Sequence, residues 1–161
     1  MDSRTGSAKG VKRMVAVTCL ASVAAACVSS AAGTSSQSAV QVMRGLKRAG
    51  MPITRYVNYS AASDPNHLLG RPGQYVSKVN FHDARLRPVR GFDTEGGGSV
   101  ETFRTRTDAQ NRYRYVHAIT SSSSLFAEYE YLQGTVFLRL SKVLTPRQAA
   151  AYKRALLRVV Q

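Results

Sequence analysis

The chain has 161 residues and a formal net charge of +14, with 23 Lys and Arg against 9 Asp and Glu. This length allows one domain with a leader, and the 43 % hydrophobic content excludes a wholly disordered chain. Both cysteines, Cys19 and Cys27, lie near the N-terminus, so we expect neither a disulfide nor a cysteine-based metal site in the folded part.

The first 26 residues have the pattern of an export signal. Residues 1–13 contain four cations, and the run Met14–Ala26 carries no charge. Because this run is shorter than the ~18–20 apolar residues of a permanent membrane helix, we expect residues 1–26 to be a cleaved signal peptide. The alternative is a cytosolic chain with an apolar N-terminal helix.

Cleavage at the junction Ala24-Ala25-Ala26-Cys27 can follow two routes. Small residues directly before a cysteine resemble a bacterial lipobox, in which a diacylglyceryl group is attached to the thiol. We therefore expect lipidation at Cys27 and anchoring to the outer face of the cell membrane, although Ala24 stands where a lipobox usually has Leu or Val. The Ala24-x-Ala26 spacing also suits general signal peptidase, which would release a secreted soluble protein.

Residues 27–38 follow the junction and are dominated by Ser, Ala and Gly. Such a composition cannot bury enough apolar surface to fold, so these residues are expected to be a flexible tether. Loss of the leader removes four cations and Asp2, which leaves a net charge of +11. The exported part therefore remains strongly basic.

Residues 39–161 are expected to form a single domain that begins with a helix and three strands. Apolar residues recur at helical spacing over 39–49, where Ser38 can cap the start and Gly50 can provide a left-handed stop. Dense β-branched and aromatic residues then predict strands. These strands are expected at 53–60, 74–81 and 99–105, with Tyr75, Val79 and Phe81 sharing one side of the second.

The second half of the domain predicts a helix, a hairpin and a final helix. The spacing Thr107-x-x-Gln110 matches a capping box for a helix over 107–119, and Gly134 suits the turn of a hairpin over 128–141. Thr145-Pro146 caps the last helix. The residues expected to face inward from the middle helix are Ala109, Tyr113, Val116 and Ile119.

The order of elements, α-β-β-β-α-β-β-α, predicts the fold class. Adjacent strands with short links favour an antiparallel sheet over a doubly wound parallel one. We therefore expect an α+β fold with a sheet of about five strands and helices packed on one face. The glycine run at 95–98 lacks the phosphate-loop pattern and is interpreted as a flexible connection.

The segment from Asp64 to Asp83 concentrates polar residues, Pro and Gly beside a strand, which is where binding residues gather. The structural alternative is that Pro and Gly set the turn while Asp64 caps one helical turn through Leu68-Leu69. Six residues form the candidate binding loop. They are Asp64, His67, Arg71, Tyr75, Lys78 and His82.

The same segment carries a resemblance to a known family. DPNHLLGRPGQYVSK at 64–78, followed by FHD at 81–83, resembles the central motif of small actinobacterial cell-envelope lipoproteins. EYEYL at 128–132, with GTVFLRL and LTPRQAA after it, is similar to the C-terminal half of the same group. The resemblance spans most of residues 38–161. It implies export and these domain boundaries, and it transfers no catalytic residue.

No catalytic constellation is expected. The three histidines show no metal-ligand spacing, so neither a metal site nor another cofactor is implied. His82 and Asp83 are neighbours on a strand, so their side chains should point to opposite faces and cannot share a catalytic hydrogen bond. Glu128 and Glu130 could act as paired carboxylates, but a solvated strand face is the favoured interpretation. We therefore expect a protein that is not an enzyme.

Basic stretches such as Arg112-Tyr113-Arg114-Tyr115 could follow a phosphate backbone. Export makes anionic lipid headgroups or wall polymers the expected partners instead of nucleic acid. The leading hypothesis is a non-enzymatic lipoprotein that acts as a binding or scaffold module at the cell envelope. The alternative is a secreted basic protein that binds anionic envelope polymers or headgroups, and the oligomeric state stays open.

Overall fold

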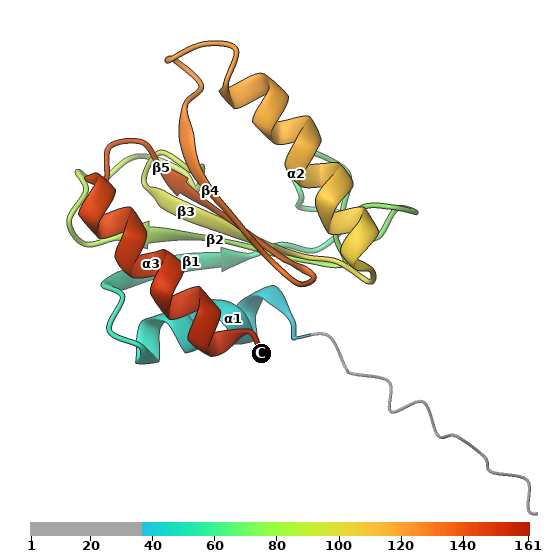
Figure 1. Cartoon of the computed structure of the whole chain (residues 1–161), viewed down its shortest axis with the longest axis horizontal. Coiled ribbons are helices and arrows are strands. Elements are labelled where there is room, and N and C mark those ends of the chain that lie inside the picture. The colour runs from blue at the N-terminus through green and yellow to red at the C-terminus, as the bar shows by residue number, and fades with distance from the viewer. Residues whose placement is uncertain (1–36) are drawn as a thin grey trace, which may run out of the picture. The chain divides into compact units, whose positions relative to one another are not determined.

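Three helices and five strands follow one another along residues 37–161, the part of the chain that this computed structural model describes (Figure 1). The predicted signal peptide, Cys27 and most of the predicted tether lie outside the described residues. The elements are α1 (Ala39–Arg48), β1 (Ile53–Asn58), β2 (Ser77–Asp83), β3 (Gly97–Thr102), α2 (Arg106–Thr120), β4 (Glu128–Gln133), β5 (Val136–Ser141) and α3 (Pro146–Val159).

The five strands form one sheet in the order β1-β2-β3-β5-β4, and every neighbouring pair is antiparallel. Gly134, with a φ of 58°, lies in the turn that joins β4 to β5. The chain leaves the sheet after β3, forms α2, and returns at the edge strand β4. The predicted α+β class, antiparallel sheet and element order are confirmed.

The helices cover both faces of the sheet, so the expectation that they share one face is wrong for α2. Figure 1 shows α1 and α3 side by side on one face and α2 on the other. Strand β5 explains the arrangement, because Leu138 packs in the core with α1 and α3 while the next residue back, Phe137, packs with Ala109 and Val116 of α2. Successive strand residues point to opposite faces, so both faces had apolar side chains to bury.

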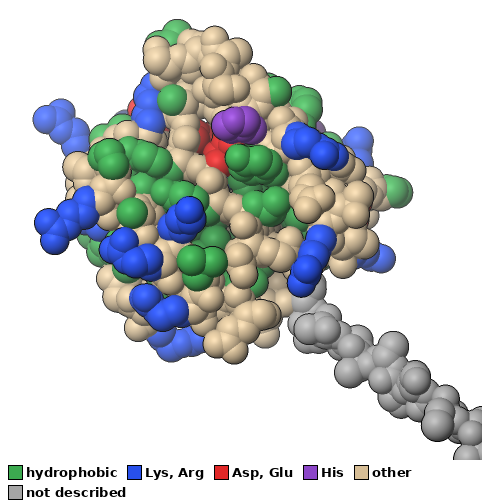
Figure 2. Space-filling model, in the orientation of Figure 1, with side chains coloured by type: hydrophobic (Ala, Val, Ile, Leu, Met, Phe, Trp, Pro, Cys, Tyr) green, Lys and Arg blue, Asp and Glu red, His purple; other side chains and the backbone are tan. Residues whose placement is uncertain are grey.

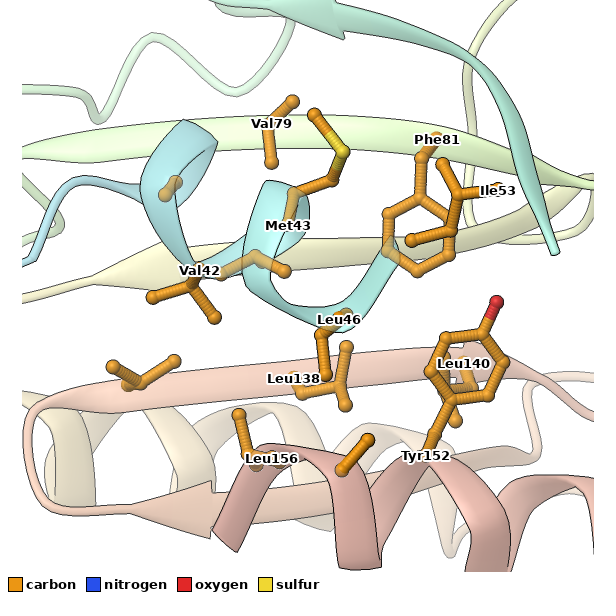
Figure 3. Close-up of a cluster of buried hydrophobic side chains, with 14 of the residues drawn as sticks. Val42, Met43, Leu46, Ile53, Val79, Phe81, Leu138, Leu140, Tyr152 and Leu156 are labelled. Atoms are coloured by element: carbon orange, nitrogen blue, oxygen red, sulfur yellow. The ribbon is translucent and has the colours of Figure 1, made fainter. Parts of the chain in front are cut away.

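The larger core lies between the sheet and the pair α1 and α3 (Figure 3). Phe81 of β2 stacks on Tyr152 of α3 with ring centroids 5.9 Å apart. The caps predicted at Ser38 and Thr145 are confirmed, and each is part of a capping box. The side chains labelled in Figure 3 are Val42, Met43, Leu46, Ile53, Val79, Phe81, Leu138, Leu140, Tyr152 and Leu156.

Two local predictions differ from the structure around β2 and β3. Tyr75 precedes β2 and packs in the smaller core with Phe103, whereas Val79 and Phe81 pack in the larger one. The glycine run is buried, and its last two residues begin β3. Gly98 lies so close to the Arg139 carbonyl and the Phe81 ring that an added Cβ would meet them at 2.6 and 2.7 Å. Close packing, not flexibility, explains these glycines.

The start and inner face of α2 also differ from prediction. The N-cap is Thr105, whose hydroxyl accepts a hydrogen bond from the Asp108 backbone, so the expected cap at Thr107 is wrong. Ala109 and Val116 are buried as expected, but Ile119 is 43 % exposed. Arg112 is buried in the inner face instead, because it pairs with a buried carboxylate on β3.

Candidate functional site

The centre of the candidate loop is a hydrogen-bonded cluster around the carboxylate of Asp64, which is fully buried. One carboxylate oxygen accepts hydrogen bonds from the backbones of Leu68 and Leu69 at 2.9 and 3.1 Å and from the Tyr75 hydroxyl at 2.6 Å. The other oxygen accepts from the Lys78 ammonium at 2.9 Å. Asp64 does bind the Leu68 and Leu69 backbones, but these residues lie in a loop with no helical turn. Three of the six candidate residues hold one another.

The electrostatics of this cluster keep Asp64 ionised and Tyr75 protonated. Burial by itself opposes ionisation of Asp64, but the hydrogen bonds from Tyr75 and Lys78 outweigh it, and the pKa of Asp64 lies well below its ordinary value. Burial, together with the hydrogen bond to that carboxylate, raises the pKa of Tyr75. Tyr75 therefore stays a donor and Asp64 an acceptor, as a structural cluster requires.

His82 and Asp83 point to opposite faces of the sheet, as predicted. The His82 ring nitrogen Nε2 lies 2.8 Å from the Gly91 carbonyl, and the ring meets Phe92 edge-on at 4.7 Å. On the other face, the Asp83 carboxylate accepts hydrogen bonds from Arg85 and Tyr152. His82 is thus used to hold the loop before β3, and it meets no carboxylate among the described residues.

Only two of the six candidate loop residues, His67 and Arg71, are exposed. His67 has a φ of 53°, which favours Gly or Asn over most other residues. The loop therefore offers a partner one imidazole and one guanidinium, far less than its sequence suggested. Cys27, the expected lipidation site, lies outside the described residues.

A second buried charge network, which the sequence interpretation missed, lies between α2 and the sheet. Glu101 of β3 is fully buried and accepts two hydrogen bonds from Arg112 of α2, at 3.0 and 3.2 Å. Arg139 of β5 lies 3.9 Å from the same carboxylate and donates two hydrogen bonds to Glu128. The available signal was the position of Arg112, which is three residues after Ala109 and four before Val116, on the inner face of the helix.

Glu128 and Glu130 are not the solvated pair that the sequence favoured. Glu128 is bound by Arg139, and the Glu130 side chain is only 5 % exposed, beneath Thr120 and His117 of α2. The His117 nitrogen Nδ1 lies 2.9 Å from Glu130. Each carboxylate already has its own partners. The two glutamates therefore connect β4 to β5 and α2 and do not form a hydrolytic pair.

An open cleft of about 640 Å³ lies beside this network, and a second of about 400 Å³ adjoins it through Ile119, Thr120 and Arg139. Exposed apolar side chains from α2 and from the loop after it line these clefts. The two arginines that line the larger cleft already form ion pairs, which leaves little charge for a ligand. The main lining residues of the larger cleft are Asn66, Gln74, Asn111, Arg112, Tyr115 and Arg139.

Most carboxylates of the domain are paired within the fold, whereas most of its cations are exposed and unpaired. Asp64, Asp83, Glu101, Glu128 and Glu130 are all engaged by cationic or histidine side chains. Only four of the 19 Lys and Arg in residues 37–161 take part in these pairs, and the other fifteen are all exposed. Asp93 and Glu95 are the exposed acids of the same range. Internal pairing removes cations and acids in equal numbers, so the net positive charge of residues 37–161 lies on the exterior.

Within residues 37–161, no group of His, Cys, Asp and Glu side chains has an arrangement that could hold a metal ion. The helices described in that range include none long and apolar enough to cross a membrane. No family model, curated protein or solved structure matches the chain.

Proposed function

We propose that this chain is an exported, lipid-anchored, non-enzymatic binding module of the cell envelope whose partners are anionic. Sorting of charge is the observation that carries the proposal. Four carboxylates are paired with Lys or Arg and Glu130 is bound by His117, while fifteen cations remain on the surface of residues 37–161 against two exposed acids and the half-buried Asp108. Such a surface attracts polyanions over roughly a Debye length, ~8–10 Å at physiological salt.

The leader and the lipobox-like junction support an envelope location. An uncharged run preceded by cations and followed by Ala26-Cys27 is typical of an exported, processed chain. In that compartment the abundant polyanions are phosphate-bearing wall polymers and anionic lipid headgroups. The resemblance to actinobacterial envelope lipoproteins supports the same assignment.

A binding role is favoured over catalysis by the state of the polar groups. The side chains considered for chemistry, His82, Glu128 and Glu130, all have partners within the fold. General acid–base catalysis needs a group that can reach a substrate proton, and none of these three is free to do so. The secreted basic protein remains the second candidate, and it differs only in the fate of Cys27.

Two measurements test the proposal. Mass spectrometry of the mature protein should find a diacylglyceryl-modified Cys27 at the N-terminus, whereas an unmodified N-terminus would favour the secreted alternative. Binding of the mature chain to a purified anionic wall polymer should weaken steeply as salt is raised. An intact chain with Met1 in the cytosol, or binding that is indifferent to salt, would contradict the proposed function.

A further inference from the structure

Seven of the fifteen exposed and unpaired cations of residues 37–161 lie on one layer, formed by α1 and α3. These two helices contain seven Lys and Arg and no Asp or Glu in 24 residues. All seven are exposed, and none forms an ion pair within residues 37–161. The seven are Arg44, Lys47, Arg48, Arg147, Lys153, Arg154 and Arg158.

The two helices form one continuous layer because they touch. Gly45 of α1 lies against Val159 of α3, so closely that an added Cβ would meet the valine methyl at 2.5 Å. Both helices turn their apolar sides to the same core, and their basic sides therefore turn outward together. In Figure 2, Lys and Arg gather on the lower left of the view, where Figure 1 draws α3, with no Asp or Glu visible among them.

An apolar side chain lies within the basic side of α3. Leu157 is 49 % exposed and neighbours Lys153 and Arg154 on the helix surface, at the border where α3 meets β4. Long cationic side chains around an exposed leucine are typical of helices that lie in the headgroup region of a bilayer, where the cations meet phosphate and the apolar group enters the acyl boundary. A soluble wall polymer would give the leucine no such environment.

We propose that the layer of α1 and α3 docks on the anionic headgroups of the membrane, with the phosphates as ligands and Leu157 inserted at the acyl boundary. Charge complementarity and the exposed leucine carry this assignment. Position along the chain agrees with it, because α1 begins at Ala39, twelve residues after Cys27. This docking rests on the proposed export. In the docked protein, α2 and its clefts would face away from the bilayer, because α2 covers the other face of the sheet.

The chain has no Trp, so single tryptophans can report which face meets lipid. We would introduce Leu157→Trp on α3 and, as the matched control, Tyr115→Trp on α2, where the native side chain is 62 % exposed. Both are placed in the mature chain with Cys27→Ser, so that no acyl group contributes. The vesicles contain phosphatidylglycerol in phosphatidylcholine, and phosphatidylcholine alone is the control.

Only the tryptophan at position 157 should shift its emission to the blue and be quenched by lipids that carry a quencher in the acyl chain, and only on the anionic vesicles. A shift at position 115 and not at 157, equal shifts at both positions, or no shift at either would overturn the docking face. A soluble wall polymer that reproduced the blue shift at 157 without lipid would assign the layer to the polymer and also overturn it.

The cations are tested by charge-matched variants in vesicle co-sedimentation. Arg44→Gln, Arg147→Gln and Arg154→Gln together remove three cations from the layer, while Arg104→Gln, Arg106→Gln and Arg114→Gln remove three from the side of α2. A cation near an anionic membrane contributes a factor of about 5 in affinity, so the first set should lose on the order of 100-fold and the second far less. Equal losses would show a response to net charge alone and would contradict the inference.

Folding and export are kept separate from this result. Replacing Arg44, Arg147 and Arg154 by Lys preserves the charge and should preserve binding, and thermal unfolding of each variant identifies any folding defect. If Cys27 is lipidated in cells but position 157 does not meet lipid, the docking fails while the proposed function stands. If the chain is never exported, the proposed function fails whatever the vesicles show.

Discussion

Arg112 of α2 donates two hydrogen bonds to the carboxylate of Glu101, which belongs to β3 and is fully buried. This pair joins the second face of the sheet to the helix that covers it. The Arg112 guanidinium also lies 5.6 Å from the ring centroid of Tyr75, so the pair links α2 to the loop before β2 as well.

We expect Arg112→Leu to lower the free energy of unfolding by about 3–5 kcal/mol, because it leaves a buried carboxylate without its main partner. The second cation, Arg139 at 3.9 Å, places the loss toward the lower end. The double variant Arg112→Leu with Glu101→Leu should recover to within about 1 kcal/mol of the native value, since no buried charge remains. Urea unfolding measures both, and a double variant as unstable as the single one would show that the ion pair is not the cause.

Gly45→Ala should destabilise the protein by about 1–3 kcal/mol, although Ala ordinarily favours a helix. The added methyl would meet both methyls of Val159, at 2.5 and 3.1 Å, so a rotation of the valine relieves at most one of the two contacts. Val159→Ala in the same chain removes those methyls and should restore most of the loss. Thermal unfolding of the single and double variants gives the coupling energy, and a coupling near zero would mean that α1 and α3 separate without cost.

Acid should destabilise the domain partly through Asp64. Its pKa is lower in the folded state than in the unfolded chain, where it is about 3.9. Its contribution is therefore complete above that unfolded value and is lost as the pH falls toward the folded value. Asp64→Asn should be less stable at neutral pH, with a shallower decline in acid. Parallel declines for native protein and Asp64→Asn would refute this assignment.

The exposed and buried parts of the candidate loop should respond differently to substitution. Arg71→Ala removes an exposed side chain and should change the free energy of unfolding by less than about 0.5 kcal/mol. Tyr75→Phe removes the hydrogen bond to Asp64 and should cost about 1.5–3 kcal/mol. We also expect Arg71→Ala to weaken polymer binding no more than loss of any other single surface cation. If Arg71→Ala alone abolished polymer binding, the candidate loop would again be the expected contact surface.

Local signals predicted the elements well because their causes lie within a few residues. The capping boxes at Ser38 and Thr145, the left-handed Gly50 and the tight turn at Gly134 are all local geometry, and the structure contains each of them. Antiparallel pairing was predicted because successive strands have no helix between them, and it holds although residues 59–76 separate β1 from β2 and residues 84–96 separate β2 from β3. The expected N-cap of α2 was wrong by two residues, since Thr105 and Thr107 both offer a capping hydroxyl.

The candidate site was predicted less well because it depends on groups distant in sequence. Polar residues in a Pro- and Gly-containing segment look the same whether they bind a partner or one another. Only the fold shows that Asp64 contacts Lys78, 14 positions later in the chain. It also shows that four of the six candidate residues are buried. The glycines before Ser99 misled in the same way, because the Phe81 and Arg139 atoms that crowd them come from other strands.

By itself, the sequence determined the leader pattern, the surplus of cations, the fold class and the order of the elements, all of which follow from composition and short-range periodicity. Tertiary structure decided which face of the sheet α2 covers, which carboxylates are neutralised inside, and that α1 and α3 join into one basic layer. The physical reason is that pairing and burial depend on distances between residues far apart in the chain, which no local pattern contains.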